Sequence, residues 1–219
     1  MDKDYNRIAG HGLDRAAALS DGVFAVAMTL IVLDIRIPEG VRVHSEAQLC
    51  AVLVGLAPRL GMYLMSFLTL GIFWVGQQTQ LNHFTRTDRD LSWIHLTFLA
   101  WVALMPFSTM LLARFITFRV ALVVYWFNIL LLGATLLWSW SHAERTGLTK
   151  SEVTPAISNA MRRRIVVAQA LYAFGALLCL INPYWSIGFI LLVQLNYAVA
   201  PRLPGRRGSG SAATKGETT

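Results

Sequence analysis

Long runs without a charged side chain constrain the fold of this chain more than any other feature. Three of them are 26, 23 and 37 residues long and cover Leu60–Thr85, Leu91–Ala113 and Ile165–Pro201. A helix needs about 20 apolar residues to cross the hydrocarbon of a bilayer, because each residue advances it by about 1.5 Å. The chain is 14% charged, whereas a soluble domain carries about 25% charged residues. The sequence therefore predicts an all-α integral membrane protein.

We expect six transmembrane helices in each subunit. The 37-residue run is too long for one span, and Asn182-Pro183 near its middle is a turn signal. The predicted organisation is a polar N-terminal leader (1–14), a six-helix transmembrane unit (15–201) and a disordered basic C-terminal tail (202–219). The six spans are expected at about 15–37, 48–80, 91–113, 120–143, 165–182 and 184–201.

The distribution of Lys and Arg predicts the orientation of these spans. With six spans, both termini lie on one side, and that side carries fourteen of the nineteen basic residues. The opposite loops carry four, and Arg59 falls inside the second span, where we expect its side chain to reach the membrane interface. Basic loops remain in the cytoplasm, so both termini are predicted to be cytoplasmic. Because the basic residues sit in loops between apolar spans, we expect no nucleic-acid partner despite the net charge of +7.

The first span carries two carboxylates in an otherwise apolar helix. Only twelve uncharged residues separate Asp21 from Asp34, which is about 18 Å of helix against about 30 Å of hydrocarbon. A carboxylate exposed to lipid near the bilayer centre costs at least about 2.5–3.5 kcal/mol. We therefore expect this helix to be enclosed by other helices, to line a wet cavity, or both.

The chemistry expected of an enzyme is missing from the sequence. No zinc-protease, nucleophile-elbow, P-loop or paired-cysteine motif is present, and the five histidines lack metal-ligand spacing. We expect no catalytic residues, no metal site and no cofactor. The Thr-Val-Gly-Tyr-Gly loop of carbonyl-lined potassium filters is also absent.

Helical spacing places an apolar stripe on the first span. At 100° per residue, Val26, Leu30 and Leu33 fall within about 60° of one another, and Thr29 flanks them. Asp21 lies on nearly the opposite side, so it would face neighbouring helices if the stripe faced a central axis. Ordinary helix packing is the alternative explanation of such a stripe.

The same span resembles the first-helix signature of the lysosomal potassium channel family (transmembrane protein 175) and its bacterial homologues. The signature reads R-x-x-x-F-S-D-G-V-F-A-I-A-x-T-L-L-V-L-D/E-I. The likeness continues more loosely through Trp74, through Leu104-Met105-Pro106-Phe107 and through the number of spans. The matching run in this chain is Arg15-x-x-x-Leu19-Ser20-Asp21-Gly22-Val23-Phe24-Ala25-Val26-Ala27-Met28-Thr29-Leu30-Ile31-Val32-Leu33-Asp34-Ile35.

The resemblance implies a potassium-permeable cation channel in a bacterial plasma membrane. It implies a homotetramer in which the first helices surround the pore and the potassium ion is the permeant species. Carried over by position, the pore constrictions are Val26, Leu30 and Leu33, and Thr29 contributes to potassium preference. The residues that match the family's polar network around the first helix are Arg15, Ser20, Asp21 and Trp74.

Two departures from the family pattern qualify these expectations. Leu19 replaces the signature phenylalanine, and Gln77 and Gln78 stand where many relatives carry histidines, so we expect a rearranged polar network. The alternative function is a secondary cation transporter or proton-coupled exchanger, with Asp21, Asp34 or Arg15 on its path. A non-conducting membrane scaffold is the third possibility.

Overall fold

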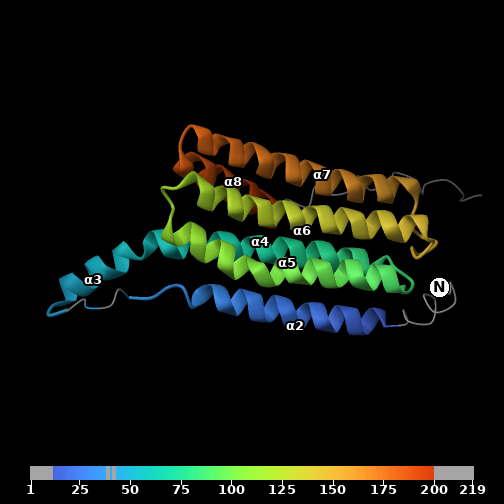
Figure 1. Ribbon diagram of the computed structural model, residues 1–219, viewed down its shortest axis with the longest axis horizontal. Coiled ribbons are helices and arrows are strands. Elements are labelled where there is room, and N and C mark those ends of the chain that lie inside the picture. Colours follow the sequence, from blue (N-terminus) through green and yellow to red (C-terminus); the bar gives the residue numbers. More distant parts are fainter. Residues whose placement is uncertain (1–11, 38–39, 41–42, 200–219) are drawn as a thin grey trace, which may run out of the picture.

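The structure is a computed structural model that describes residues 12–37, 40 and 43–199. In this part of the chain the long helices lie side by side in one bundle (Figure 1). The elements in chain order are α2 (Leu13–Val32), α3 (Glu46–Gly55), α4 (Ala57–Asn82), α5 (Arg89–Arg114), α6 (Arg119–Arg145), α7 (Pro155–Leu177), the 3-10 helix η1 (Leu178–Leu180) and α8 (Pro183–Val199).

Five of the described helices are long and apolar enough to cross a bilayer. They are α2, α4, α5, α6 and the continuous run of α7 and η1. The prediction of an all-α, multi-pass membrane protein is confirmed. The sixth predicted span coincides with α8, which has 17 described residues, or about 25 Å of helix.

The third and fourth predicted spans agree with α5 and α6 to within two residues at each end. The start of α5 is fixed by Asp88, whose side chain accepts a hydrogen bond from the backbone N–H of Leu91 at 2.7 Å. Pro106 lies inside α5 and does not interrupt it. Neighbouring helices can compensate for the hydrogen bond that a proline removes from a membrane helix.

The prediction of one long second helix over 48–80 is wrong. The helix is interrupted at Leu56, which separates a short α3 from a long α4. Pro58 lies in the first turn of α4. A proline is favourable there because the first turn needs no amide donor, whereas within one continuous helix its ring would clash with the carbonyl of Val54. As a result, α3 leaves the bundle at the end where α4 begins (Figure 1).

Two other helix boundaries differ from the prediction. The first span was expected to reach residue 37, but α2 ends at Val32, and the Nε of Arg36 donates to the carbonyl of Leu33 at 3.0 Å. The fifth span was expected from residue 165, but α7 begins at Pro155, capped by the hydroxyl of Thr154. The basic triplet 162–164 is therefore helical. Residues 1–11 of the predicted leader and the whole predicted tail, 202–219, lie outside the described residues. The last two residues of the predicted leader, Leu13 and Asp14, already belong to α2.

Buried polar side chains join four helices in the centre of the bundle. The Tyr125 hydroxyl of α6 lies 3.2 Å from the Ser66 hydroxyl and 3.0 Å from that of Thr69, both on α4. Thr109 of α5 donates to Ser66 at 2.8 Å, and Gln194 of α8 donates to Thr69 at 2.6 Å. These contacts attach α8 to the bundle core. Helix α2 lies at the edge of the bundle, packed on α4 and α5 (Figure 1).

Candidate functional site

Helix α2 has one buried face, which packs into the bundle. Ser20, Phe24, Ala27 and Ile31 recur at spacings of three and four residues, and all four are buried. Phe24 lies against Phe98 of α5, with the ring centroids 6.0 Å apart. This face fixes the rotation of α2 about its own axis, and so determines which residues point away from the subunit.

The opposite face of α2 is an exposed apolar stripe. Val26 is 57% exposed, Leu30 46% and Leu33 57%. In a membrane protein such an apolar surface is covered either by lipid or by other protein chains. We define the exposed stripe by Leu19, Gly22, Val26, Thr29, Leu30 and the capping residue Leu33, which lie within about 100° of one another on an ideal helix.

Two residues of the stripe, Thr29 and Leu33, differ from the others in backbone contact and in position on the helix. The Thr29 hydroxyl donates to the carbonyl of Val26 at 2.8 Å. Its proton is therefore used within the helix, while the oxygen lone pairs remain free to accept a hydrogen bond or to contact a cation. Leu33 lies just beyond the last helical residue, as the C-terminal cap of α2.

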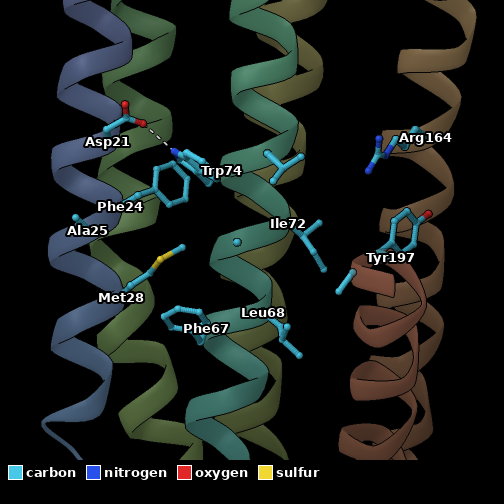
Figure 2. Close-up of a pocket in the computed structure, with 13 residues that line it drawn as sticks. Asp21, Phe24, Ala25, Met28, Phe67, Leu68, Ile72, Trp74, Arg164 and Tyr197 are labelled. Atoms are coloured by element: carbon cyan, nitrogen blue, oxygen red, sulfur yellow. Dashed lines mark hydrogen bonds between the residues drawn. The ribbon is translucent and has the colours of Figure 1, made fainter. Parts of the chain in front are cut away.

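Asp21 is bound to α4 and lies outside the stripe. One of its carboxylate oxygens accepts from the indole N–H of Trp74 and from the side-chain amide of Gln78, both at 2.8 Å. Figure 2 shows the Asp21 carboxylate directed at the Trp74 ring, between α2 and α4. The structure thus brings together Asp21 and Trp74, two of the four residues expected in the polar network.

Ser20 belongs to a second cluster one residue away. Its hydroxyl donates to the side-chain oxygen Oε1 of Gln77 at 2.9 Å and lies 3.3 Å from Nε2 of His95. The Gln77 amide nitrogen lies 3.1 Å from Nδ1 of His95, and His95 Nε2 lies 3.0 Å from the Ala16 carbonyl. A neutral His95 ring protonated on Nε2 satisfies all these contacts. The cluster therefore joins α2, α4 and α5 without a charged group.

Arg15 does not join either cluster. It is exposed in the first turn of α2, and none of the hydrogen bonds found among residues 12–37, 40 and 43–199 uses its guanidinium. Conversely, sequence reasoning missed His95. The only signal available was that His95 is the single histidine of the charge-free run 91–113, where an imidazole needs a polar partner.

A cavity of about 610 Å³ opens beside these contacts (Figure 2). Its wall is mainly apolar and comes from α2 and α4, with Phe24, Met28 and Phe67 among its members. Arg164 of α7 and Tyr197 of α8 close the side opposite Asp21 (Figure 2). No group of three or more His, Cys, Asp or Glu side chains in the described part of the chain could hold a metal ion.

Comparison with known proteins identifies the family of the chain. A model of the family described as endosomal/lysosomal potassium channel TMEM175 matches residues 15–106. A protein of Streptomyces collinus named as a potassium channel is 32% identical over 192 residues, covering 85% of this chain and 84% of that protein. A protein of Chamaesiphon minutus with the same name is 28% identical and is covered over 93% of its length.

Human TMEM175, named as an endosomal/lysosomal proton channel, is 31% identical over 100 residues, or 43% of this chain and 20% of the human protein. The crystal structure of a Chamaesiphon minutus homologue, described as a lysosomal potassium-selective channel TMEM175 homologue, superposes with a TM-score of 0.73. That match has 27% sequence identity and covers 86% of this chain and 97% of the other. The chain therefore belongs to the TMEM175 family, which is a family of ion channels and not of enzymes.

Proposed function

We propose that this protein is a potassium-permeable cation channel and that the exposed stripe of α2 lines its pore. The single observation that carries the proposal is the exposure of Val26, Leu30 and Leu33, on a helix whose other face is buried in its own subunit. Relatives that match most of the chain are named as potassium channels, which supports potassium as the permeant ion. Apolar side chains would form the constrictions, so ions pass by a test of size and dehydration.

The pore in this proposal lies between copies of the chain. One subunit exposes the stripe outward, so several copies must bring their stripes together to enclose a path. Asp21 supports this arrangement, because it remains exposed even after bonding to Trp74 and Gln78. A lipid-facing α2 would expose that carboxylate to hydrocarbon, whereas neighbouring subunits would cover it. The family resemblance favours four copies.

The proposed selectivity is modest. The three apolar rings offer no ligands to replace the water that an ion loses, and Thr29 supplies one hydroxyl oxygen per subunit beside Val26 and Leu30. Val26 is small, so its ring should be wide and well hydrated. Thr29 is therefore the residue to which we assign the preference for potassium over sodium.

The proposed topology has six spans, with α8 as the sixth and both termini in the cytoplasm of a bacterial cell. The excess of Lys and Arg on the terminal side supports it. We propose that residues 15–201 form the channel unit, between the leader and the basic tail. The bacterial relatives support a plasma-membrane location.

The experiment that tests this function is ion flux from liposomes holding the purified protein, under a potassium gradient and then a sodium gradient. We expect fast passive flux that is larger for potassium and is altered in Leu30→Ala. The matched control is Leu192→Ala, because Leu192 of α8 is also exposed but lies outside the stripe. Slow, saturable exchange that requires a counter-ion would identify the transporter instead, and flux no greater than that of empty liposomes would indicate a scaffold.

A further inference from the structure

Three arginines converge on one cavity at the end of the bundle where α2 ends, α4 begins and α5 ends (left in Figure 1). The cavity measures about 630 Å³. Arg36 comes from the segment after α2, Arg59 from the first turn of α4 and Arg114 from the last residue of α5. Asp34 is the one acidic residue in its wall, so the described lining carries a net charge of +2 (three cations less one anion).

In the described residues these guanidiniums contact backbone carbonyls and an aromatic ring, and they form no pair with a carboxylate. Arg59 donates to the carbonyl of Arg36 at 3.3 Å, and Arg36 donates to the carbonyl of Leu33 at 3.0 Å. The Arg114 guanidinium carbon lies 5.9 Å from the ring centroid of Phe115. Within the described residues, none of the three arginines forms an ion pair. Most of their N–H donors therefore remain available to a ligand.

The rest of the cavity wall is apolar. Pro106, Phe107 and Met110 line it from α5, and Leu30 and Ile31 line it from α2. These residues belong to helices apolar enough to cross the membrane, and the arginines lie where those helices end. The cavity thus has an apolar part toward the hydrocarbon and a cationic part toward the membrane surface. A phospholipid has the same division between acyl chain and phosphate.

We propose that this cavity binds an anionic phospholipid, with its phosphate on Arg36, Arg59 and Arg114 and the start of an acyl chain against Phe107 and Met110. Guanidinium groups recognise phosphate through paired, charge-assisted hydrogen bonds, which distinguishes them from a simple positive surface. The cavity borders the exposed stripe and shares Leu30 and Leu33 with it, whereas the three arginines lie outside the stripe. The proposal is independent of whether the protein conducts ions.

The test is lipid binding to the delipidated, purified full-length protein, measured by native mass spectrometry. Short-chain phosphatidylglycerol is compared with phosphatidylcholine of the same acyl chains, and inorganic phosphate is titrated separately. We expect phosphatidylglycerol to bind at least about tenfold more tightly than phosphatidylcholine. Removing two guanidiniums in Arg59→Gln/Arg114→Gln should weaken phosphatidylglycerol binding about 100-fold, or about tenfold for each lost charge-assisted contact.

A matched pair of variants controls for charge and for folding. Arg145→Gln/Arg163→Gln removes two exposed guanidiniums from α6 and α7, outside the cavity, and should leave the lipid preference unchanged. Arg59→Lys/Arg114→Lys retains the charge without the paired donors and should bind with intermediate affinity. Equal binding of both lipids, or full binding by the glutamine variant, would overturn the proposal. Binding of inorganic phosphate without any lipid preference would overturn the lipid assignment.

Discussion

At the scale of single residues, α2 uses its polar side chains in two different ways. Thr29 donates within the helix and leaves its oxygen lone pairs outward, on the exposed stripe. On the side of α2 away from the stripe, Asp21 accepts a hydrogen bond from Trp74 of α4, and Ser20 donates one to Gln77 of α4. The partner that each polar residue contacts therefore separates Thr29, on the exposed stripe, from Ser20 and Asp21, which pack against α4.

Replacing Thr29 by valine tests the first role. Valine is β-branched like threonine and has nearly the same shape, so the helix should persist while the outward oxygen is lost. We expect conduction to continue and the permeability ratio of potassium to sodium to fall several-fold, measured by reversal potentials. The control is Thr79→Val, because Thr79 lies on α4, outside the stripe, and donates to the Val75 carbonyl at 2.7 Å in the same manner. An unchanged ratio in Thr29→Val would contradict the assignment.

Replacing Asp21 by alanine tests the second role. The indole of Trp74 and the amide of Gln78 would both lose their acceptor, at a cost on the order of 2 kcal/mol in the assembled protein. We expect a lower thermal midpoint and a smaller assembled fraction in size-exclusion chromatography, with ion preference unchanged. Asp21→Asn retains an acceptor oxygen, so its thermal midpoint and assembled fraction should lie between those of the wild type and of Asp21→Ala. A stable assembly of wild-type size with altered selectivity would count against a packing role.

At the scale of helices, the buried hydroxyl cluster holds α8 to α4, α5 and α6. Tyr125→Phe removes the oxygen that contacts Ser66 and Thr69, which are fully buried. The polar groups left behind should lower the free energy of unfolding by about 1–3 kcal/mol. Thermal denaturation in detergent measures this loss, and Tyr184→Phe is the control, because Tyr184 is 59% exposed. Equal midpoints for the two variants would mean that the cluster does not stabilise the bundle.

The sequence predicted those helices whose ends coincide with a change from charged to apolar residues. For α5 and α6 the charges at Arg89, Arg114, Arg119 and Arg145 mark both ends. The break between α3 and α4 could not be predicted, because Pro58 has the same local signature in a kinked helix as in the first turn of a new one. The start of α7 was missed because a helix can continue beyond the hydrocarbon through polar residues.

The candidate site could be predicted only partly, for a similar reason. Helical periodicity determines which residues share a face, so the stripe of Val26, Leu30 and Leu33 could be derived from α2 alone. The contacts of Ser20 with Gln77 and His95 join residues 57 and 75 positions apart. Their pairing depends on how α2, α4 and α5 pack, and single-sequence periodicity contains no information on that packing.

At the scale of the whole molecule, the described part of the chain leaves two features without a partner inside the bundle. It exposes an apolar stripe on α2, and its α3 extends away from the bundle (Figure 1). Both features are explained if copies of the chain pack around a shared axis with α2 innermost. In that arrangement the exposed stripe would face an ion path and not lipid.

Silver block of potassium flux through Leu30→Cys tests that claim most directly. The background for the measurement is Cys50→Ser/Cys179→Ser, which removes both native thiols. The silver ion is close to potassium in size and reacts with thiolates, so it should enter the pore and stop the flux. Leu192→Cys, on the exposed surface of α8, is the control and should remain conducting. Continued flux through Leu30→Cys, with its thiol shown by mass spectrometry to have reacted, would contradict a pore lined by α2.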